Sequence, residues 1–254
     1  MTTDALVARN SDFYNALWSK SYLTRPERFN TWAVVAPLLA DAPSRLEIGP
    51  GLRPRLTIAG THFIDLSPPA VARLVASGGL AQVGEITELP YPDQTFGLVT
   101  AFDVIEHITD DERAFDELTR VLKPGGHLVL SVPLHPERWN AFDTLVGHAR
   151  RYEPATLQAL LARHGLVVER SVAFGMESKN PALVYLTVQG LTRRHTLAVH
   201  LYNWLFLPLG MWFQKRLMMV DGLMDLTEVD EVLLVCRRSH SDEGAGAPEM
   251  GDRR

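Results

Sequence analysis

Glycines and acidic side chains stand at the ends of three short apolar runs in the first third of the chain. The residues concerned are Glu47, Gly49, Gly51, Asp65, Glu85 and Ile86. Glycine lets a backbone approach a ligand closely, and open α/β sheets bind ligands where their parallel strands end. The carboxylate of Glu47 would repel a pyrophosphate and attract a cationic amino-acid group. Asp65 can accept both hydroxyls of a ribose, or can simply place a favourable charge ahead of a helix.

Taken together, these residues predict a site for a cationic nucleoside such as S-adenosylmethionine. Glu85 would face the adenine amino group, and Ile86 would pack on the adenine ring. The same reasoning disfavours a nicotinamide dinucleotide, because Glu47 would lie beside its pyrophosphate.

Three histidines are candidates for a general base, which would remove a proton from an oxygen or nitrogen nucleophile. They are His107 in Ile105-Glu106-His107, His135 in Pro133-Leu134-His135 and His148 in Gly147-His148-Ala149. We rank His148 first and His135 second, and we interpret His107 as a packing residue. The alternative for His148 is that it fixes its loop together with Arg151 through hydrogen bonds.

A divalent ion is a further alternative. Asp103, Glu106 and His107 form the pattern D-x-x-E-H, which places Asp103 and His107 one helical turn apart. Such a set could hold an ion that binds the oxygens of an acceptor. The pattern also occurs without a metal, and we therefore predict no metal ligands.

Short apolar runs alternate with helical patterns, which is typical of βαβ units and a parallel sheet. The predicted strands are 45–49, 61–65, 80–85, 97–102, 127–132, 166–173 and 231–237. Helices are predicted at 11–20, 29–39, 67–77, 110–122 and 154–161. Ser67 before Pro68 is a helix N-cap, and Lys123-Pro124-Gly125-Gly126 is predicted to end a helix.

The pattern predicts three parts of the chain: amino-terminal helices over 1–40 that cap the active site, a sheet domain over 41–238, and a solvated tail over 239–254. The sheet domain contains a helical insertion at about 176–228. Its apolar residues are Leu197, Leu201, Trp204, Leu205 and 208–212, and Arg193, Arg194, Lys215 and Arg216 flank them. The insertion could be a lid over an apolar acceptor, a homodimer interface, a membrane or lipid contact through 197–216, or a plain helical core.

Composition narrows the function classes. The 254 residues carry a formal net charge of -5, so nucleic acid is not an expected partner. Cys236 is the single cysteine, which excludes an internal disulfide and a cysteine-based zinc cluster. Asp4 and polar neighbours stand where a signal peptide needs an apolar core, so we expect a cytoplasmic protein, with peripheral membrane contact left open.

The order of these motifs resembles the class I S-adenosylmethionine-dependent methyltransferases, and especially their type 11 branch. The matching stretches are LEIGPG at 46–51, FIDLS at 63–67, GEITELPYPDQTFGLVTAFDVIEHI at 84–108 and VLKPGGHLVLSVP at 121–133. The resemblance implies a doubly wound, seven-stranded Rossmann-like sheet with a reversed last strand. The sequence departs from the family pattern at Leu52-Arg53-Pro54-Arg55, where the family usually has a third glycine and a fuller helix. We therefore expect the first helix of the sheet domain to be lost or reduced.

The resemblance also implies roles for individual residues. Glu47, Gly49 and Gly51 would hold the methionine end of the cofactor, Asp65 with Leu66 the ribose, Glu85 with Ile86 the adenine, and Phe102 with Asp103 would face the sulfonium and its methyl group. The expected reaction is methyl transfer to an oxygen of a small hydroxylated or sugar-like acceptor, which leaves S-adenosylhomocysteine. The alternatives are a non-catalytic cofactor-binding or regulatory protein, and a methyltransferase that acts on a lipophilic or membrane-associated acceptor.

Overall fold

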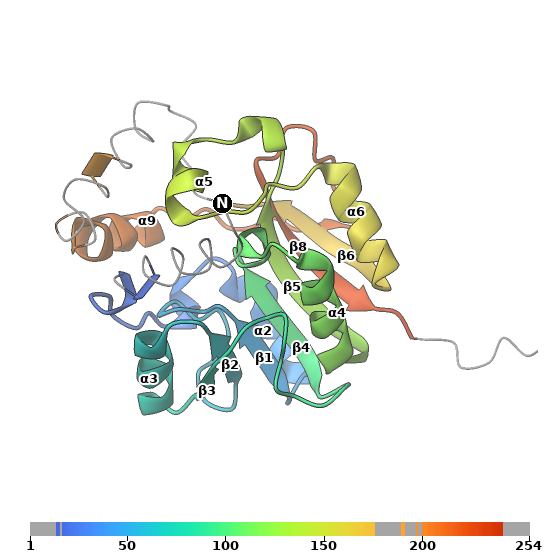
Figure 1. The fold of residues 1–254 in the computed structure, drawn as a ribbon, viewed down its shortest axis with the longest axis horizontal. Helices are drawn as coiled ribbons and strands as arrows, with labels where there is room; N and C mark the ends of the chain where they lie inside the picture. The colour runs from blue at the N-terminus through green and yellow to red at the C-terminus, as the bar shows by residue number, and fades with distance from the viewer. Residues whose placement is uncertain (1–13, 16, 176–188, 191–196, 198–199, 241–254) are drawn as a thin grey trace, which may run out of the picture.

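A single mixed sheet with helices on both faces forms the body of the protein (Figure 1). The computed structural model describes residues 14–15, 17–175, 189–190, 197 and 200–240. Within these residues, eight strands pair in the order β3-β2-β1-β4-β5-β8-β6-β7. Their bounds are Arg45–Ile48 (β1), His62–Asp65 (β2), Leu80–Val83 (β3), Phe96–Phe102 (β4), Leu122–Pro133 (β5), Leu166–Ala173 (β6), Val220–Asp221 (β7) and Glu231–Arg238 (β8).

The predicted doubly wound fold is confirmed, with one strand more than expected. The first five strands pair in parallel, and β8 runs antiparallel to both β5 and β6, as the reversed last strand should. The additional strand is β7, two residues that pair antiparallel with β6 at the edge of the sheet. Two residues are too few to leave a period in the sequence, so the pattern did not indicate this strand.

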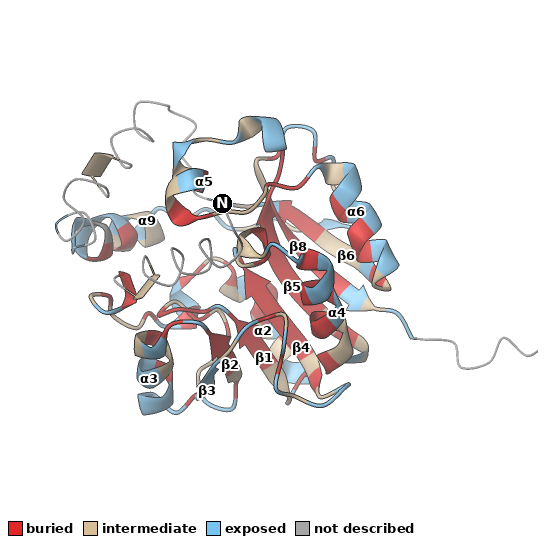
Figure 2. Cartoon of the chain, in the orientation of Figure 1, coloured by how far each residue is buried: buried red, intermediate tan, exposed pale blue. Residues whose placement is uncertain are grey.

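Helices α4 (Asp111–Val121) and α6 (Pro154–Arg163) cover one face of the sheet. The apolar stripe predicted for α4 is buried, including Phe115 and Leu118, and it packs against Val99 and Leu128 of the central strands. These strands are nearly continuous in apolar residues because both of their faces are covered, and Figure 2 shows the buried residues gathered along them.

Helix α2 (Trp32–Asp41) covers the opposite face. Its Val34, Val35 and Leu38 pack with Leu98 of β4 and with Val235 of β8. The other amino-terminal helix predicted to cap the sheet is described only at residues 14–15 and 17–18, which are helical and lie against the loop after β1. The short helix η1 (Pro26–Arg28) joins the two segments, and α3 (Pro68–Ala76) covers the β2–β3 end of the sheet.

Three local predictions can be compared with the structure. The loss of the first helix is confirmed, because residues 49–61 contain none. Ser67 occupies the N-cap position of α3, but its side chain makes no capping bond. The helix end predicted at residues 123–126 is confirmed, because α4 ends at Val121, but these residues belong to β5, which begins at once with Leu122 paired to Phe96. Gly125, with φ +71°, absorbs the irregularity between these strands.

The remaining helices lie on the side where the parallel strands end. They are η2 (Ile105–His107), η3 (Pro136–Arg138), α5 (Ala141–Val146), the π-helical η4 (Tyr202–Phe206) and α9 (Leu207–Trp212). Arg193, Arg194 and residues 241–254 of the predicted tail lie outside the described residues. None of the described helices has the length and apolar character needed to cross a membrane.

Candidate active site

The loop after β1 has a conformation that depends on its glycines. Gly49 and Gly51 adopt left-handed φ values of +62° and +53°. A Cβ on Gly49 would lie 2.6 Å from Cγ2 of Val104, and a Cβ on Gly51 would lie 2.2 Å from the ring of Trp18. The loop therefore has room for backbone only, between the loop after β4 on one side and the amino-terminal segment on the other.

Two buried carboxylates hold this loop in place. Glu47 accepts hydrogen bonds from the backbone N–H groups of Arg55 at 2.8 Å and Leu56 at 2.9 Å. Burial raises the pKa of Glu47 to about 7, although these two hydrogen bonds oppose the shift. The geometry supports a role in shaping the loop, and contact between Glu47 and the methionine end of a cofactor stays a prediction.

Asp65, at the end of β2, fits the predicted ribose site. Its two carboxylate oxygens accept from the N–H groups of Gly51 and Ser67, each at 2.8 Å, and burial raises its pKa. A carboxylate has about four lone-pair positions, so two remain for ribose hydroxyls. The neighbouring Leu66 is exposed and could cover a ligand.

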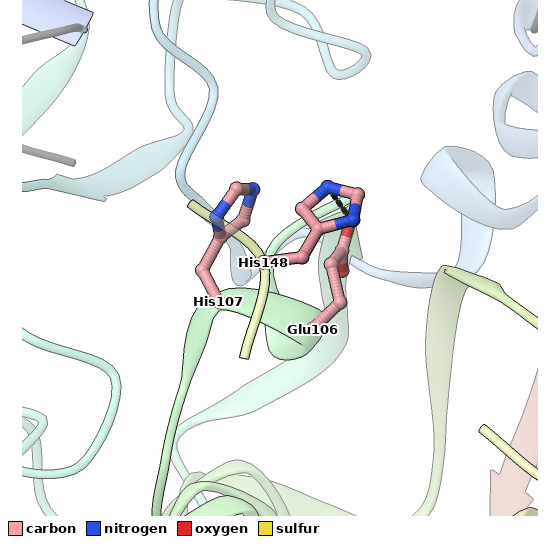
Figure 3. Close-up of side chains that lie close together, drawn as sticks. All are labelled: Glu106, His107 and His148. Carbon is pink, nitrogen blue, oxygen red and sulfur yellow. Dashed lines mark ion pairs between the residues drawn. The ribbon is translucent and has the colours of Figure 1, made fainter. Parts of the chain in front are cut away.

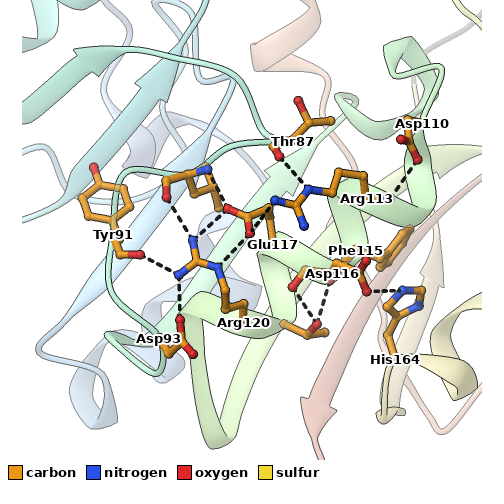
Figure 4. A network of polar contacts seen from close by, with 12 residues as sticks. Thr87, Tyr91, Asp93, Asp110, Arg113, Phe115, Asp116, Glu117, Arg120 and His164 are labelled. Atoms are coloured by element: carbon orange, nitrogen blue, oxygen red, sulfur yellow. Dashed lines mark hydrogen bonds and ion pairs between the residues drawn. The ribbon is translucent and has the colours of Figure 1, made fainter.

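The predicted adenine contacts lie just beyond β3, which ends two residues earlier than expected. Glu85 is exposed and Ile86 is buried. The segment that follows them is fastened to α4 by a network of ion pairs (Figure 4). Glu117 accepts from the N–H of Leu89 at 2.7 Å, and Arg120 ion-pairs with Glu117 while donating to the carbonyl oxygens of Leu89 and Tyr91.

Asp103 follows β4 in a strained conformation. Its φ is +54°, which is uncommon for a residue other than glycine. The hydroxyl of Ser131 on β5 donates to the Asp103 carboxylate, and the Asp103 N–H donates back to Ser131. Asp103 is exposed at this edge of the sheet, whereas the preceding Phe102 is buried beneath the guanidinium of Arg55.

Glu106, His107 and His148 come together next to Asp103 (Figure 3). His148 Nε2 lies 3.9 Å from Glu106 Oε1, and the two imidazole rings meet edge to face at 4.7 Å. Tyr14 places its hydroxyl 3.3 Å from His107 Nε2. Burial, followed by the charge of Asp103, raises the pKa of Glu106, while burial lowers the pKa of His107 to about 3 and keeps it neutral.

His148 is oriented by a residue that the sequence did not single out. Asp143, which is fully buried in α5, accepts a hydrogen bond from Nδ1 of His148 at 2.8 Å and another from Nε of Arg151 at 2.8 Å. Burial alone would raise the pKa of Asp143, but the hydrogen bonds from His148 and Arg151 hold it below its usual value. The spacing Asn140-x-x-Asp143 is a capping-box pattern, and this pattern could have drawn attention to Asp143 in the sequence.

The same geometry bears on the two alternatives weighed for this region. Glu106, His107 and His148 could each offer one ligand atom to a metal ion, with all these atoms within 4.8 Å of one another, so the set includes His148 in place of Asp103. The alternative that His148 and Arg151 fix their loop is also consistent with the structure, because both bind Asp143.

His135 lies apart from the contacts that join Tyr14, Glu106, His107 and His148. Its Nε2 is 2.9 Å from the carbonyl oxygen of Leu226, and its Nδ1 is 3.3 Å from Glu137. These contacts tie the loop after β5 to the segment before β8. The structure therefore supports a positioning role for His135 and leaves its use as a base a prediction.

A cavity of about 170 Å³ opens beside Arg151, at the ends of β5 and β6. Pro133, Phe174 and Gly175 contribute to its walls, together with Glu231 at the start of β8. Arg151 also donates to Asp143, so its side chain alone connects the cavity with the pair of Asp143 and His148. This position makes the cavity a candidate space for an acceptor.

Comparisons with known proteins agree with the fold and the loop. Residues 48–130 match the family model described as Methyltransferase domain. A protein of Mycolicibacterium smegmatis named as an S-adenosylmethionine-dependent methyltransferase is 38% identical over 88 residues, which are 34% of this chain and 34% of that protein. A Streptomyces avermitilis demethylmenaquinone methyltransferase is 40% identical over 62 residues, 24% of this chain and 26% of that protein. The matched segments thus span about a third of these relatives or less.

A solved structure extends the likeness over most of the chain. The S-adenosylmethionine-dependent methyltransferase of Thermotoga maritima covers 84% of this chain and 89% of its own, with a TM-score of 0.57 and 17% identity, which supports the fold alone. The family match starts at the end of β1 and runs into β5, so it contains the glycine loop, Asp65, Glu85 and Asp103. Residues 48–130 are thus similar to a methyltransferase domain, and the fold of most of the chain is similar to that of an S-adenosylmethionine-dependent methyltransferase.

Proposed function

We propose that this protein transfers a methyl group from S-adenosylmethionine to an oxygen of a small hydroxylated or sugar-like acceptor, with His148 as the general base. The observation that carries the proposal is the pair formed by Asp143 and His148 at the edge of the sheet where a class I domain holds its cofactor. Asp143 binds Nδ1, so Nε2 of His148 is the nitrogen that can take a proton.

The cofactor side rests on the fit of the residues described above. Gly49 and Gly51 give the loop after β1 a conformation in which Val104 and Trp18 leave no room for a Cβ, and Asp65 retains acceptor capacity for the ribose. The exposed Asp103 places negative potential at the end of β4, which would favour a cationic group there. When bound, S-adenosylmethionine supplies a methyl group on an excellent leaving group.

The chain's own residues would then position the acceptor and move one proton. While the acceptor oxygen takes up the methyl group, its hydroxyl proton would pass to Nε2 of His148. The Asp143 carboxylate stabilises the imidazolium that results, and Arg151 keeps that carboxylate in place. Burial also raises the pKa of Tyr14, so its hydroxyl stays neutral beside His107.

The proposal is tested by measuring binding and turnover on the same protein. Titration calorimetry should show binding of S-adenosylmethionine and of S-adenosylhomocysteine, and a panel of hydroxylated acceptors should yield an O-methylated product by mass spectrometry. Binding without product across amine, hydroxyl and lipophilic acceptors would instead support a cofactor-binding protein. Binding of a nicotinamide dinucleotide in place of S-adenosylmethionine would contradict the proposal. Activity that survives exhaustive chelation would remove the metal alternative at Glu106, His107 and His148.

A further inference from the structure

The segment that precedes β7 differs in charge from the rest of the chain. Residues 178–220 contain Lys179, Arg193, Arg194, Lys215 and Arg216 and no aspartate or glutamate, in a protein with a formal net charge of -5. Of these five, Lys215 and Arg216 belong to the described residues, and both are exposed. A locally basic stretch on an acidic protein is a means of orienting one side of the molecule towards an anionic surface.

The described part of this segment also exposes large apolar side chains. We call the set Trp204, Leu205, Phe206, Leu209, Trp212 and Phe213 the apolar face. Trp212 is 84% exposed, Phe213 71% and Trp204 67%. Single exposed apolar residues are ordinary on a protein surface. Six exposed apolar side chains within ten residues are not, and they indicate a surface that binds a partner. In Figure 2, α9 accordingly shows mainly exposed and intermediate residues.

Contacts on the inner side of the segment hold the apolar face outward. Asn203 and Leu207, one turn apart, are buried, and Asn203 Oδ1 accepts from Arg53 Nη2 at 3.1 Å. Further along, Asn30 donates from its backbone to Gln214 and from its side chain to the carbonyl oxygen of Lys215. The segment is thus fastened to the loop after β1 and to the region before α2, and the cationic Lys215 and Arg216 follow directly on the apolar face.

We propose that the apolar face and the adjacent Lys215 and Arg216 dock the protein on an anionic lipid bilayer. Tryptophan and phenylalanine prefer the interfacial layer of a membrane, and an amphipathic helix with basic residues lies in its plane. A second copy of this chain is a poorer occupant, because a two-fold interface would bring Lys215 and Arg216 against their own copies. Docking goes beyond the proposed methyl transfer and stands without it, since binding is measured without a reaction.

The test is co-sedimentation of the full chain with vesicles of phosphatidylcholine alone and of phosphatidylcholine mixed with phosphatidylglycerol. The protein should sediment with the anionic vesicles, far less with the neutral ones, and less again when salt is raised. Changing Lys215→Gln with Arg216→Gln should lower binding to anionic vesicles about tenfold or more. Changing Trp212→Ser with Phe213→Ser should abolish the blue shift of tryptophan fluorescence that accompanies insertion.

Matched controls exist in α3, β3 and β5, outside the apolar face. Val75→Ser with Leu80→Ser removes two exposed apolar side chains, and Arg73→Gln with Lys123→Gln removes two exposed cations. Both pairs should bind vesicles as the unchanged protein does. The proposal is overturned if the unchanged protein ignores anionic vesicles, or if controls and test variants bind equally. It is also overturned if sedimentation equilibrium shows a dimer that the apolar-face variant dissociates while vesicle binding is absent.

Discussion

At the scale of single residues, the proposed proton transfer depends on the arrangement of Asp143 and His148. A histidine alone in a loop can rotate and can carry its proton on either nitrogen. Here the buried Asp143 binds Nδ1 of His148, and Arg151 and the N–H of Asn140 bind Asp143 in turn. The conformational entropy of the His148 side chain is therefore lost during folding and not during the reaction.

The His148→Gln variant should bind S-adenosylmethionine as tightly as the unchanged protein and turn over about 100-fold more slowly, because glutamine cannot accept the acceptor's proton. Calorimetry and an initial-rate assay on the same preparation measure the two quantities. The matched control is His62→Gln, at the amino end of β2, which should keep its rate. An unchanged rate in His148→Gln would remove His148 from the mechanism.

Asp143→Asn separates orientation from simple folding. The change should slow turnover by about 10-fold to 10⁴-fold, since asparagine no longer selects one tautomer of His148 or stabilises its cation. It should also move the rising limb of the pH–rate profile towards lower pH, an effect that loss of packing does not produce. Rates measured between pH 5 and pH 9 test this, and a profile that keeps its midpoint would limit Asp143 to a structural role.

Glu47 gives a pH signature in stability. Because burial raises its folded-state pKa from 4.5 to about 7, its stabilising contribution is complete below pH 4.5 and is lost as pH rises through 7. Glu47→Gln cannot ionise. The free energy of unfolding of the unchanged protein should therefore fall relative to the variant between pH 5 and pH 8, by about 1–3 kcal/mol. Urea titrations of both proteins measure this difference. Parallel curves of unfolding free energy against pH would show that folding does not change the pKa of Glu47.

At the scale of elements, side-chain contacts replace the missing first helix. Residues 49–61 contain no helix, yet the loop is held by Glu47 and Asp65 from two strands and by Trp18 from the amino-terminal segment. Helix α2, from before β1, covers the face of the sheet against Leu56 of this loop. The cofactor loop thus depends on segments that come before it in the chain.

Gly51→Ala should destabilise the protein by about 2–4 kcal/mol, because the left-handed φ and the contact with Trp18 both oppose a Cβ. Gly78→Ala is the matched control: it has φ +89° and nothing within 4 Å of the added carbon, so it should cost only about 1 kcal/mol. In a Trp18→Ala background the cost of Gly51→Ala should fall towards that of the control. Additive costs in urea unfolding would contradict this packing.

At the scale of the whole molecule, acidic and basic side chains are concentrated in different parts of the sequence. Asp65, Glu85 and Asp103 are brought to one edge of the sheet by three different strands, while the stretch 178–220 is basic. The net charge of -5 hides this separation. The acidic edge would favour a cationic cofactor, and the basic segment would favour an anionic surface.

The acidic edge predicts how salt affects binding. Raising ionic strength should weaken binding of the cationic S-adenosylmethionine about threefold more than binding of S-adenosylhomocysteine, whose sulfur is neutral, because ions screen only the first attraction. Calorimetry of both ligands at low and high sodium chloride measures the ratio. Equal salt dependence would mean that the carboxylates at this edge do not face the sulfonium.

Local patterns predicted most of the elements correctly, and for a clear reason. The strands buried on both faces are continuous apolar runs, and α4 carries a regular apolar stripe. Buried positions are apolar, so both patterns can be recognised in the sequence. Local patterns were misleading where a neighbour decided the outcome. Residues 123–126 have the composition of a helix end, but pairing between Leu122 and Phe96 draws them into β5. The two-residue β7 exists only because β6 offers it an edge.

The sequence by itself determined the class of fold and the residue types along the edge where the parallel strands end, because these depend on periodicity and on motifs that are contiguous in the chain. Only the tertiary structure decided which of the candidate histidines has a buried carboxylate on Nδ1. Asp143 binds His148, while His135 is hydrogen-bonded to the carbonyl oxygen of Leu226, a residue 91 positions away. Asp143 and His148 are only five positions apart, but the contacts of His148 with Glu106 and His107 depend on where the loops after β4 and α5 meet, and no local pattern records that distance.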